Sequence, residues 1–127
     1  MNLENNASSK EFLILTKYKT FMNILDKIIE NIPKKDYFYK NKLKELSIEL
    51  LYSINKTNNE DNYKLISSYK VEINSLINTI DYIIERLFIK GYIAETSLKK
   101  VSYKLSEINR MSNKWLDNKM DYDSKNK

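Results

Sequence analysis

The 127-residue sequence contains no cysteine and no histidine, and each absence removes a class of chemistry. Without cysteine, the chain forms no disulfide and offers no thiolate as a nucleophile or a metal ligand. Without histidine, it lacks the commonest general base and the commonest imidazole ligand. Catalytic systems of the Ser/His and Cys/His types are excluded. The carboxylate-bridged metal sites of helical bundles are excluded as well, because they use Glu-x-x-His pairs.

Glycine and proline are nearly absent, with one residue of each, Gly91 and Pro33. A β-sandwich or a β-barrel needs many tight turns, which depend on these residues. A single glycine also cannot build a glycine-rich phosphate loop. Among the 17 carboxylates, no two stand out as an acid–base pair. The sequence therefore predicts a helical protein that is not an enzyme and that uses no metal, no cofactor and no small-molecule substrate.

Long apolar runs are missing too. No stretch reaches the roughly 18 uncharged apolar residues that a membrane span requires. The first nine residues lack the basic-then-apolar pattern of a signal peptide. These features predict a cytoplasmic protein with no membrane partner, and the lack of cysteine is compatible with a reducing compartment. A length of 127 residues fits one domain.

Apolar residues instead recur at helical spacing in four segments. The first is expected from a capping box at Ser8 and Glu11 to the residues before Pro33. The second begins near Asp36 as N-cap and ends in a polar loop at residues 55–59. The third runs over about 60–90 and stops at Gly91, and the fourth covers 98–116. Their stripes consist of Leu15, Tyr18, Met22, Leu25, Ile29 and Ile32; Tyr39, Leu43, Leu46, Leu50 and Ile54; Ile66, Tyr69, Ile73, Leu76, Ile80, Ile83 and Leu87; and Leu98, Val101, Leu105, Ile108 and Trp115.

Four amphipathic helices with short connections become antiparallel neighbours. The expected fold is therefore an all-α, up-down-up-down four-helix bundle over residues 9–118, between disordered tails at 1–8 and 119–127. The third segment has an unusually broad apolar face, with Ile77, Ile84, Phe88 and Ile89 beside its main stripe. A single bundle need not cover all of this face, so we also expect a homo-oligomer.

The net charge of +5 is concentrated at one end of this expected bundle. The first and third connections share an end, and the flanking residues 27–45 and 85–104 hold eleven basic and five acidic residues. Codon usage rich in A and T explains a large number of lysines but not their position. Four of them (Lys34, Lys35, Lys99 and Lys100) lie near helix N-termini, where the helix dipole disfavours cations. The pattern favours an anionic partner such as nucleic acid over a merely solvated charged end.

Tyrosines accompany these lysines, and their rings could stack on unpaired bases. They are Tyr37, Tyr39, Tyr92 and Tyr103. Packing at helix ends accounts for them equally well, so they add little to the argument from charge.

The sequence Ile-Asn-Arg-Met-Ser-Asn-Lys-Trp-Leu at residues 108–116 resembles the closing motif of the Avd family, roughly Ile-Gly-Arg-Met-Leu-Gly-Gly-Trp-Leu. Avd proteins are the accessory variability determinants of diversity-generating retroelements, and they are small four-helix bundles. The resemblance also takes in the Pro-Lys turn at Pro33 and the long apolar segment before the motif. The matching positions are Arg110, Met111, Trp115 and Leu116. The chain departs from the pattern at Asn109, Asn113 and Lys114, where glycines are expected, and at Ser112, where leucine is expected.

The resemblance implies a non-catalytic, cytoplasmic partner of a reverse transcriptase that forms a pentameric ring. Such a protein binds nucleic acid, namely template RNA and its cDNA. Arg110 lies on the polar face and joins the lysines as a candidate contact. The candidate nucleic-acid-binding residues are Lys34, Lys35, Lys40, Lys42, Lys44, Lys90, Lys99, Lys100, Lys104 and Arg110. The alternative is a bundle that only mediates protein–protein assembly, with its lysines serving solubility.

Overall fold

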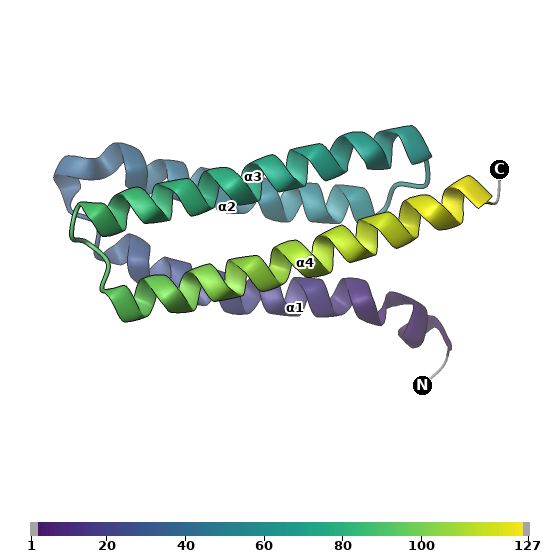
Figure 1. Ribbon diagram of the computed structural model, residues 1–127, viewed down its shortest axis with the longest axis horizontal. Helices are drawn as coiled ribbons and strands as arrows, with labels where there is room; N and C mark the ends of the chain where they lie inside the picture. The colour runs from purple at the N-terminus through teal and green to yellow at the C-terminus, as the bar shows by residue number, and fades with distance from the viewer. Residues whose placement is uncertain (1–2, 126–127) are drawn as a thin grey trace.

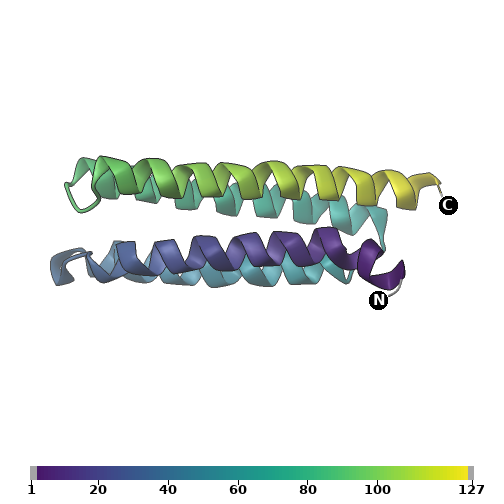
Figure 2. The same ribbon diagram turned by 90° about the horizontal axis from the view of Figure 1, so that it is seen from below.

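A computed structural model describes residues 3–125, with side chains over 13–121, and confirms the all-α four-helix bundle (Figure 1). The helices are α1 (Leu3–Glu30), α2 (Tyr37–Asn58), α3 (Tyr63–Ile89) and α4 (Glu95–Lys125). A short 3-10 helix, η1 (Lys34–Asp36), lies between α1 and α2. Successive helices run antiparallel, and the bundle has the same elongated outline in both views (Figures 1 and 2). Each helix packs against two others, so α1 and α3 occupy opposite corners of a square.

Several helix ends differ from the prediction. Helix α1 begins at Leu3, before the expected capping box, and α4 continues to Lys125, so both predicted limits of the bundle, 9 and 118, lie inside helices. Residues 1, 2, 126 and 127 of the predicted tails lie outside the described part. Helix α2 runs on to Asn58, through the segment expected to be a loop. The buried hydroxyl of Thr57 donates to the Ser53 carbonyl there, and this burial outweighs the low helix propensity of the asparagines.

The connections use recognisable local chemistry. The Asn62 side chain caps α3 by accepting hydrogen bonds from the backbone N–H groups of Lys64 and Leu65 at 3.0 and 3.3 Å. Gly91 ends α3 with a φ of +86°, as predicted. The N–H of Gly91 donates to the carbonyl of Phe88, and that of Tyr92 donates to the carbonyl of Leu87. This pair of bonds is a Schellman motif, and it fixes the direction in which the chain leaves α3.

The core is made of the predicted stripes and of residues beside them. Ile77 and Ile84 are buried inside the bundle, and Phe88 packs against the core, whereas Ile89 remains 63% exposed. Helix α3 needs this broad face because it packs against both α2 and α4. The width of the face is therefore satisfied largely within one chain, and it gives no reason to expect a homo-oligomer. The oligomeric state itself stays a prediction.

Polar groups also link the helices. The buried Tyr18 hydroxyl on α1 donates to the Ser47 carbonyl on α2, and burial raises the pKa of Tyr18. The Glu72 carboxylate on α3 accepts hydrogen bonds from Ser53 Oγ at 3.0 Å and from Lys56 Nζ at 3.1 Å. These bonds join α2 to α1 on one side and to α3 on the other.

Candidate nucleic-acid interface

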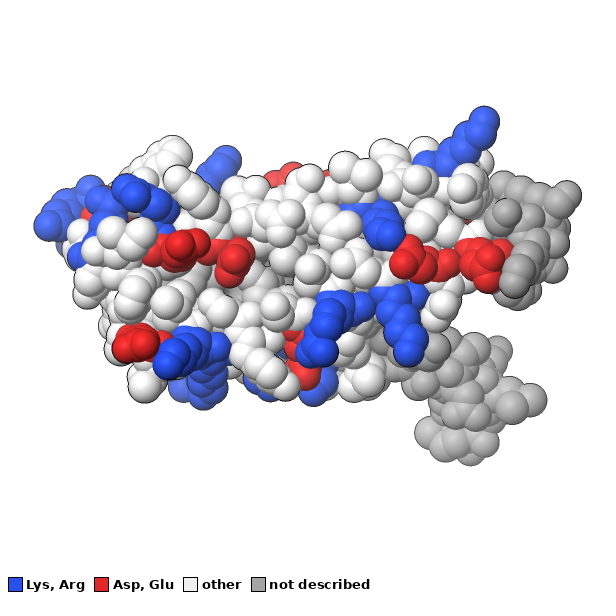
Figure 3. Space-filling view, in the orientation of Figure 1, with Lys and Arg blue, Asp and Glu red and all other residues white. Residues whose placement is uncertain are grey.

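The two connections α1–α2 and α3–α4 lie at the same end of the bundle, on the left in Figure 1. We call the residues that form this end, 27–45 and 85–104, the basic end. Lys and Arg side chains gather there in the space-filling view (Figure 3), while the visible long face mixes both signs of charge. The α2–α3 connection and the outer ends of α1 and α4 lie at the opposite end (Figure 1). The structure thus confirms the topology on which the predicted polarity of charge depends.

Asp36 fastens the two connections of the basic end to each other. Its carboxylate accepts a hydrogen bond from the Tyr92 hydroxyl, and it pairs with Lys90 Nζ at 3.5 Å. The Tyr92 hydrogen bond and then the Lys90 charge hold the pKa of Asp36 below its usual value, and the same bond raises the pKa of Tyr92. Asp36 occupies the predicted N-cap position of α2, but its side chain makes no capping bond. The cap is absent because the carboxylate is engaged with the other connection.

Three of the predicted contact lysines have carboxylate partners. Lys90 pairs with Asp36, Lys42 with Glu45 at 3.8 Å, and Lys99 with Glu95 at 3.5 Å. The last two pairs are one helical turn apart on exposed surfaces, where an ion pair contributes only about 0.5 kcal/mol. A phosphate can therefore compete for Lys42 and Lys99, whereas Lys90 belongs to the fastening of the two connections.

Six predicted contact lysines form no ion pair with the described residues. Lys40 and Lys104 are half-buried and the other four are exposed. They come from η1, from the first turns of α2 and from the first turns of α4. They therefore lie at the same end of the bundle, although they come from separate parts of the sequence. The six are Lys34, Lys35, Lys40, Lys44, Lys100 and Lys104.

Arg110 is exposed but does not belong to this group. It follows Glu95, the first residue of α4, by 15 residues, which is about 22 Å along the helix. Elsewhere in the Avd-like motif, Trp115 and Leu116 are buried core residues and Met111 is half-buried. Among the four positions that match the motif, Arg110 is therefore the one with the greatest freedom to contact a partner, and it would do so at a separate site.

The structure also shows exposed apolar side chains that the sequence reading missed. Phe38 is 70% exposed in the first turn of α2, beside Tyr37, which is 65% exposed. Of the other predicted tyrosines, Tyr103 is exposed, whereas Tyr39 is half-buried and Tyr92 is bound to Asp36. The exposure of Phe38 could have been predicted from the sequence, because Phe38 lies outside the apolar stripe of α2, which begins at Tyr39.

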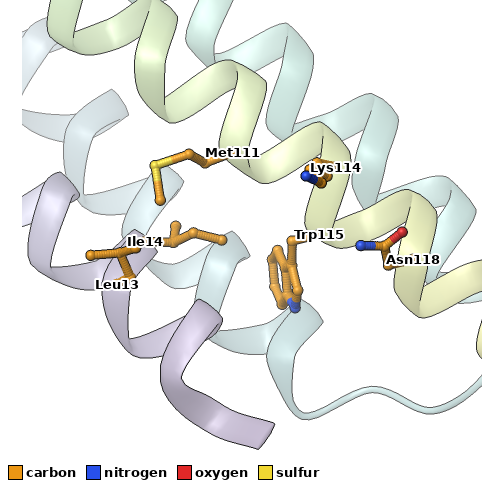
Figure 4. A pocket seen from close by; sticks show the side chains of 6 residues that line it. All are labelled: Leu13, Ile14, Met111, Lys114, Trp115 and Asn118. Atoms are coloured by element: carbon orange, nitrogen blue, oxygen red, sulfur yellow. The ribbon is translucent and has the colours of Figure 1, made fainter. Parts of the chain in front are cut away.

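Two hollows lie along the sides of the bundle. One of about 160 Å³ lies between α1 and α4 (Figure 4), lined by Leu13, Ile14, Met111, Lys114, Trp115 and Asn118. The other, of about 220 Å³, is a polar groove between α3 and α4 that contains Asp81. Burial, and then the nearby Glu85, raises the pKa of Asp81.

Within the described residues no three metal-ligating side chains converge, and no helix combines the length and apolarity of a membrane span.

No protein-family model and no curated protein matches this chain. Membership of the Avd family is therefore not shown, and the likeness of residues 108–116 to its motif stays a prediction.

Proposed function

We propose that this protein is a non-catalytic accessory protein of the Avd type, which binds nucleic acid and acts with the reverse transcriptase of a diversity-generating retroelement. The observation that carries the nucleic-acid part is the gathering at the basic end of six lysines that form no ion pair with the described residues. Lysine contacts to phosphates displace condensed counterions and require no particular sequence. Such a group of lysines suits template RNA and cDNA alike.

The remaining parts of the proposal rest on the motif in α4. In it, exposed Arg110 is the candidate contact for the reverse transcriptase or its RNA. Assembly into a homo-oligomer, a pentamer by the resemblance, would repeat the basic end around a ring. Each copy would then bind further phosphates, so avidity would raise the affinity for a long strand. Action beside a reverse transcriptase also implies a cytoplasmic location.

Charge reversal tests the basic end directly. In one variant Lys34, Lys35 and Lys100 are changed to Glu. In the matched control, three lysines away from this end, Lys19, Lys64 and Lys114, are changed to Glu. Each variant replaces three lysines, so the net charge changes equally. None of the six lysines forms an ion pair with the described residues.

We expect the basic-end variant to bind oligonucleotides at least about tenfold more weakly, and the control to change much less. The slope of log K against log salt should flatten by about 0.7 to 0.9 for each phosphate that no longer binds a lysine. Fluorescence anisotropy over a salt series gives both quantities. Equal weakening in the two variants would mean that the charge acts as a diffuse cloud and that the basic end is not a site.

A second candidate function, a protein–protein assembly module, is favoured by a different observation. Ile48 and Tyr52 on α2 are 59% and 63% exposed, and they line one surface hollow together with Lys44, Glu45 and Glu49. Neighbouring exposed apolar residues rimmed by charged ones are typical of an interface. If neither charge variant alters affinity and the protein binds no oligonucleotide, this function replaces the first. Light scattering that gave the mass of a monomer at micromolar concentration would contradict both the ring and this module.

A further inference from the structure

We infer that the basic end prefers single-stranded nucleic acid, whose unpaired bases stack on Tyr37 and Phe38. The inference rests on the proposed function and specifies its ligand. It starts from two aromatic side chains that α2 presents to solvent immediately after Lys34 and Lys35, both exposed and without ion pairs to the described residues.

The exposure of these rings follows from where they fall on α2. The buried residues of this helix, such as Leu43 and Leu50, define its inner face. Tyr37 and Phe38 lie more than about 100° around the helix from that face, since each residue advances by about 100°. The inner position of the first turn is taken by Tyr39, which packs against the core. Neither exposed ring can turn inward without unwinding the turn.

The Phe38 ring is restrained although it is exposed. It meets the Tyr39 ring edge to face, with centroids 5.6 Å apart and an interplanar angle of 75°. Tyr39 is in turn held by the core and by Lys90 Nζ, which lies 5.7 Å from its ring centroid. A ring supported in this way loses less conformational entropy when a base stacks on it.

Aromatic rings interleaved with cations match the chemistry of an unpaired strand. The rings accept the faces of bases and the lysines contact the phosphates. In a duplex the base faces are already stacked inside the helix, so only the lysines would contribute. A lipid surface is the other partner for aromatic and basic residues, but it requires an apolar face along several turns of a helix. The next turns of α2 carry Lys44, Glu45 and Glu49 outward among the exposed Ile48 and Tyr52, so the apolar face is interrupted by charges, which favours nucleic acid.

The experiment compares a single-stranded oligonucleotide with a duplex of the same length for the wild type and two double variants. One variant is Tyr37→Ser with Phe38→Ser. The matched control is Tyr52→Ser with Tyr63→Ser, which removes two exposed aromatic residues outside the basic end. The first variant should bind the single strand at least about tenfold more weakly and the duplex almost unchanged. The control should match the wild type for both ligands, and circular dichroism checks that all three proteins are folded.

A Phe38→Trp variant gives a direct readout of stacking. The only native tryptophan, Trp115, is buried, so quenching of tryptophan fluorescence by a ligand reports mainly on the new, exposed indole. Single strands should quench it, and duplexes and vesicles of anionic lipid should not.

The possible outcomes separate the stacking from the proposed function. Equal, salt-dependent binding of both ligands by the wild type and by the first variant would overturn the stacking and leave the proposed function standing. Binding of neither ligand would overturn both. Binding only to anionic vesicles, abolished in the Tyr37 and Phe38 variant, would assign the same residues to a membrane and also overturn both.

Discussion

At the scale of single residues, Ser112 is the least expected member of the core. It is fully buried on the apolar stripe of α4, and its Oγ has no hydrogen-bond partner among the described residues. A buried hydroxyl without a partner costs about 1–3 kcal/mol. We therefore expect Ser112→Ala to raise the free energy of unfolding by about 1 kcal/mol, measured by urea denaturation.

Ser53 provides the matched control, because it is equally buried but donates to the Glu72 carboxylate at 3.0 Å. Ser53→Ala should lower the free energy of unfolding by about 1–2 kcal/mol, since it leaves a charged acceptor with one bond fewer. A loss of stability in Ser112→Ala as well would show that its hydroxyl has a partner in solution, such as an internal water molecule.

At the scale of the element, the end of α3 depends on Gly91. Its φ of +86° is strained for any residue with a Cβ, although a Cβ there would meet no atom within 4 Å. The cost of Gly91→Ala is therefore one of backbone conformation alone, about 1–2 kcal/mol of unfolding free energy. Gly91→Asn should cost less, because asparagine tolerates left-handed conformations. Thermal denaturation of the two variants gives the order; equal losses would point to a steric cause instead.

The interactions of Asp36 with Tyr92 and Lys90, which join the two connections, should make the free energy of unfolding depend on pH. The folded-state pKa of Asp36 is lowered, so its contribution is present above the unfolded pKa and is lost as pH falls through the folded value. Tyr92→Phe removes the largest cause of this shift. We expect the variant to be less stable than the wild type at pH 7, and the difference to narrow below about pH 4. A gap that stayed constant with pH would contradict this assignment; Tyr103→Phe, an exposed site, is the control.

The helices could be predicted from the sequence more fully than their ends. Periodicity placed the four helices and Gly91, because the repeat of buried residues is a local property of the chain. The end of α2 was misplaced, since the burial of Ser53 and Thr57 is decided by packing between helices. Helices α1 and α4 also extend beyond their predicted limits. The hydrogen bond between Tyr92 and Asp36 joins residues 56 apart in the sequence, so no local sequence pattern predicts it. The positions of the lysines were predicted, but which of them are paired was not.

At the scale of the whole molecule, crowding of like charge at the basic end should cost stability at low ionic strength. Exposed charges within about a Debye length, roughly 10 Å at 0.1 M salt, repel one another and are screened as salt rises. We expect the thermal midpoint to increase by a few °C, equivalent to about 1 kcal/mol, from about 20 to about 300 mM sodium chloride. The variant with Lys34, Lys35 and Lys100 changed to Glu should gain less. A midpoint that fell with salt would mean that ion pairs such as Lys56–Glu72 outweigh the repulsion.

The antiparallel arrangement of the helices has one more consequence for that end. There α1 and α3 present their C-termini while α2 and α4 present their N-termini, so two partial negative charges lie beside two partial positive ones. Beyond about one helix diameter these backbone fields largely cancel. The electrostatic potential that a polyanion meets as it approaches from solution is therefore set almost wholly by charged side chains. The backbone contribution to this potential stays the same when a lysine is replaced, so each substitution at the basic end reports on side-chain charge alone.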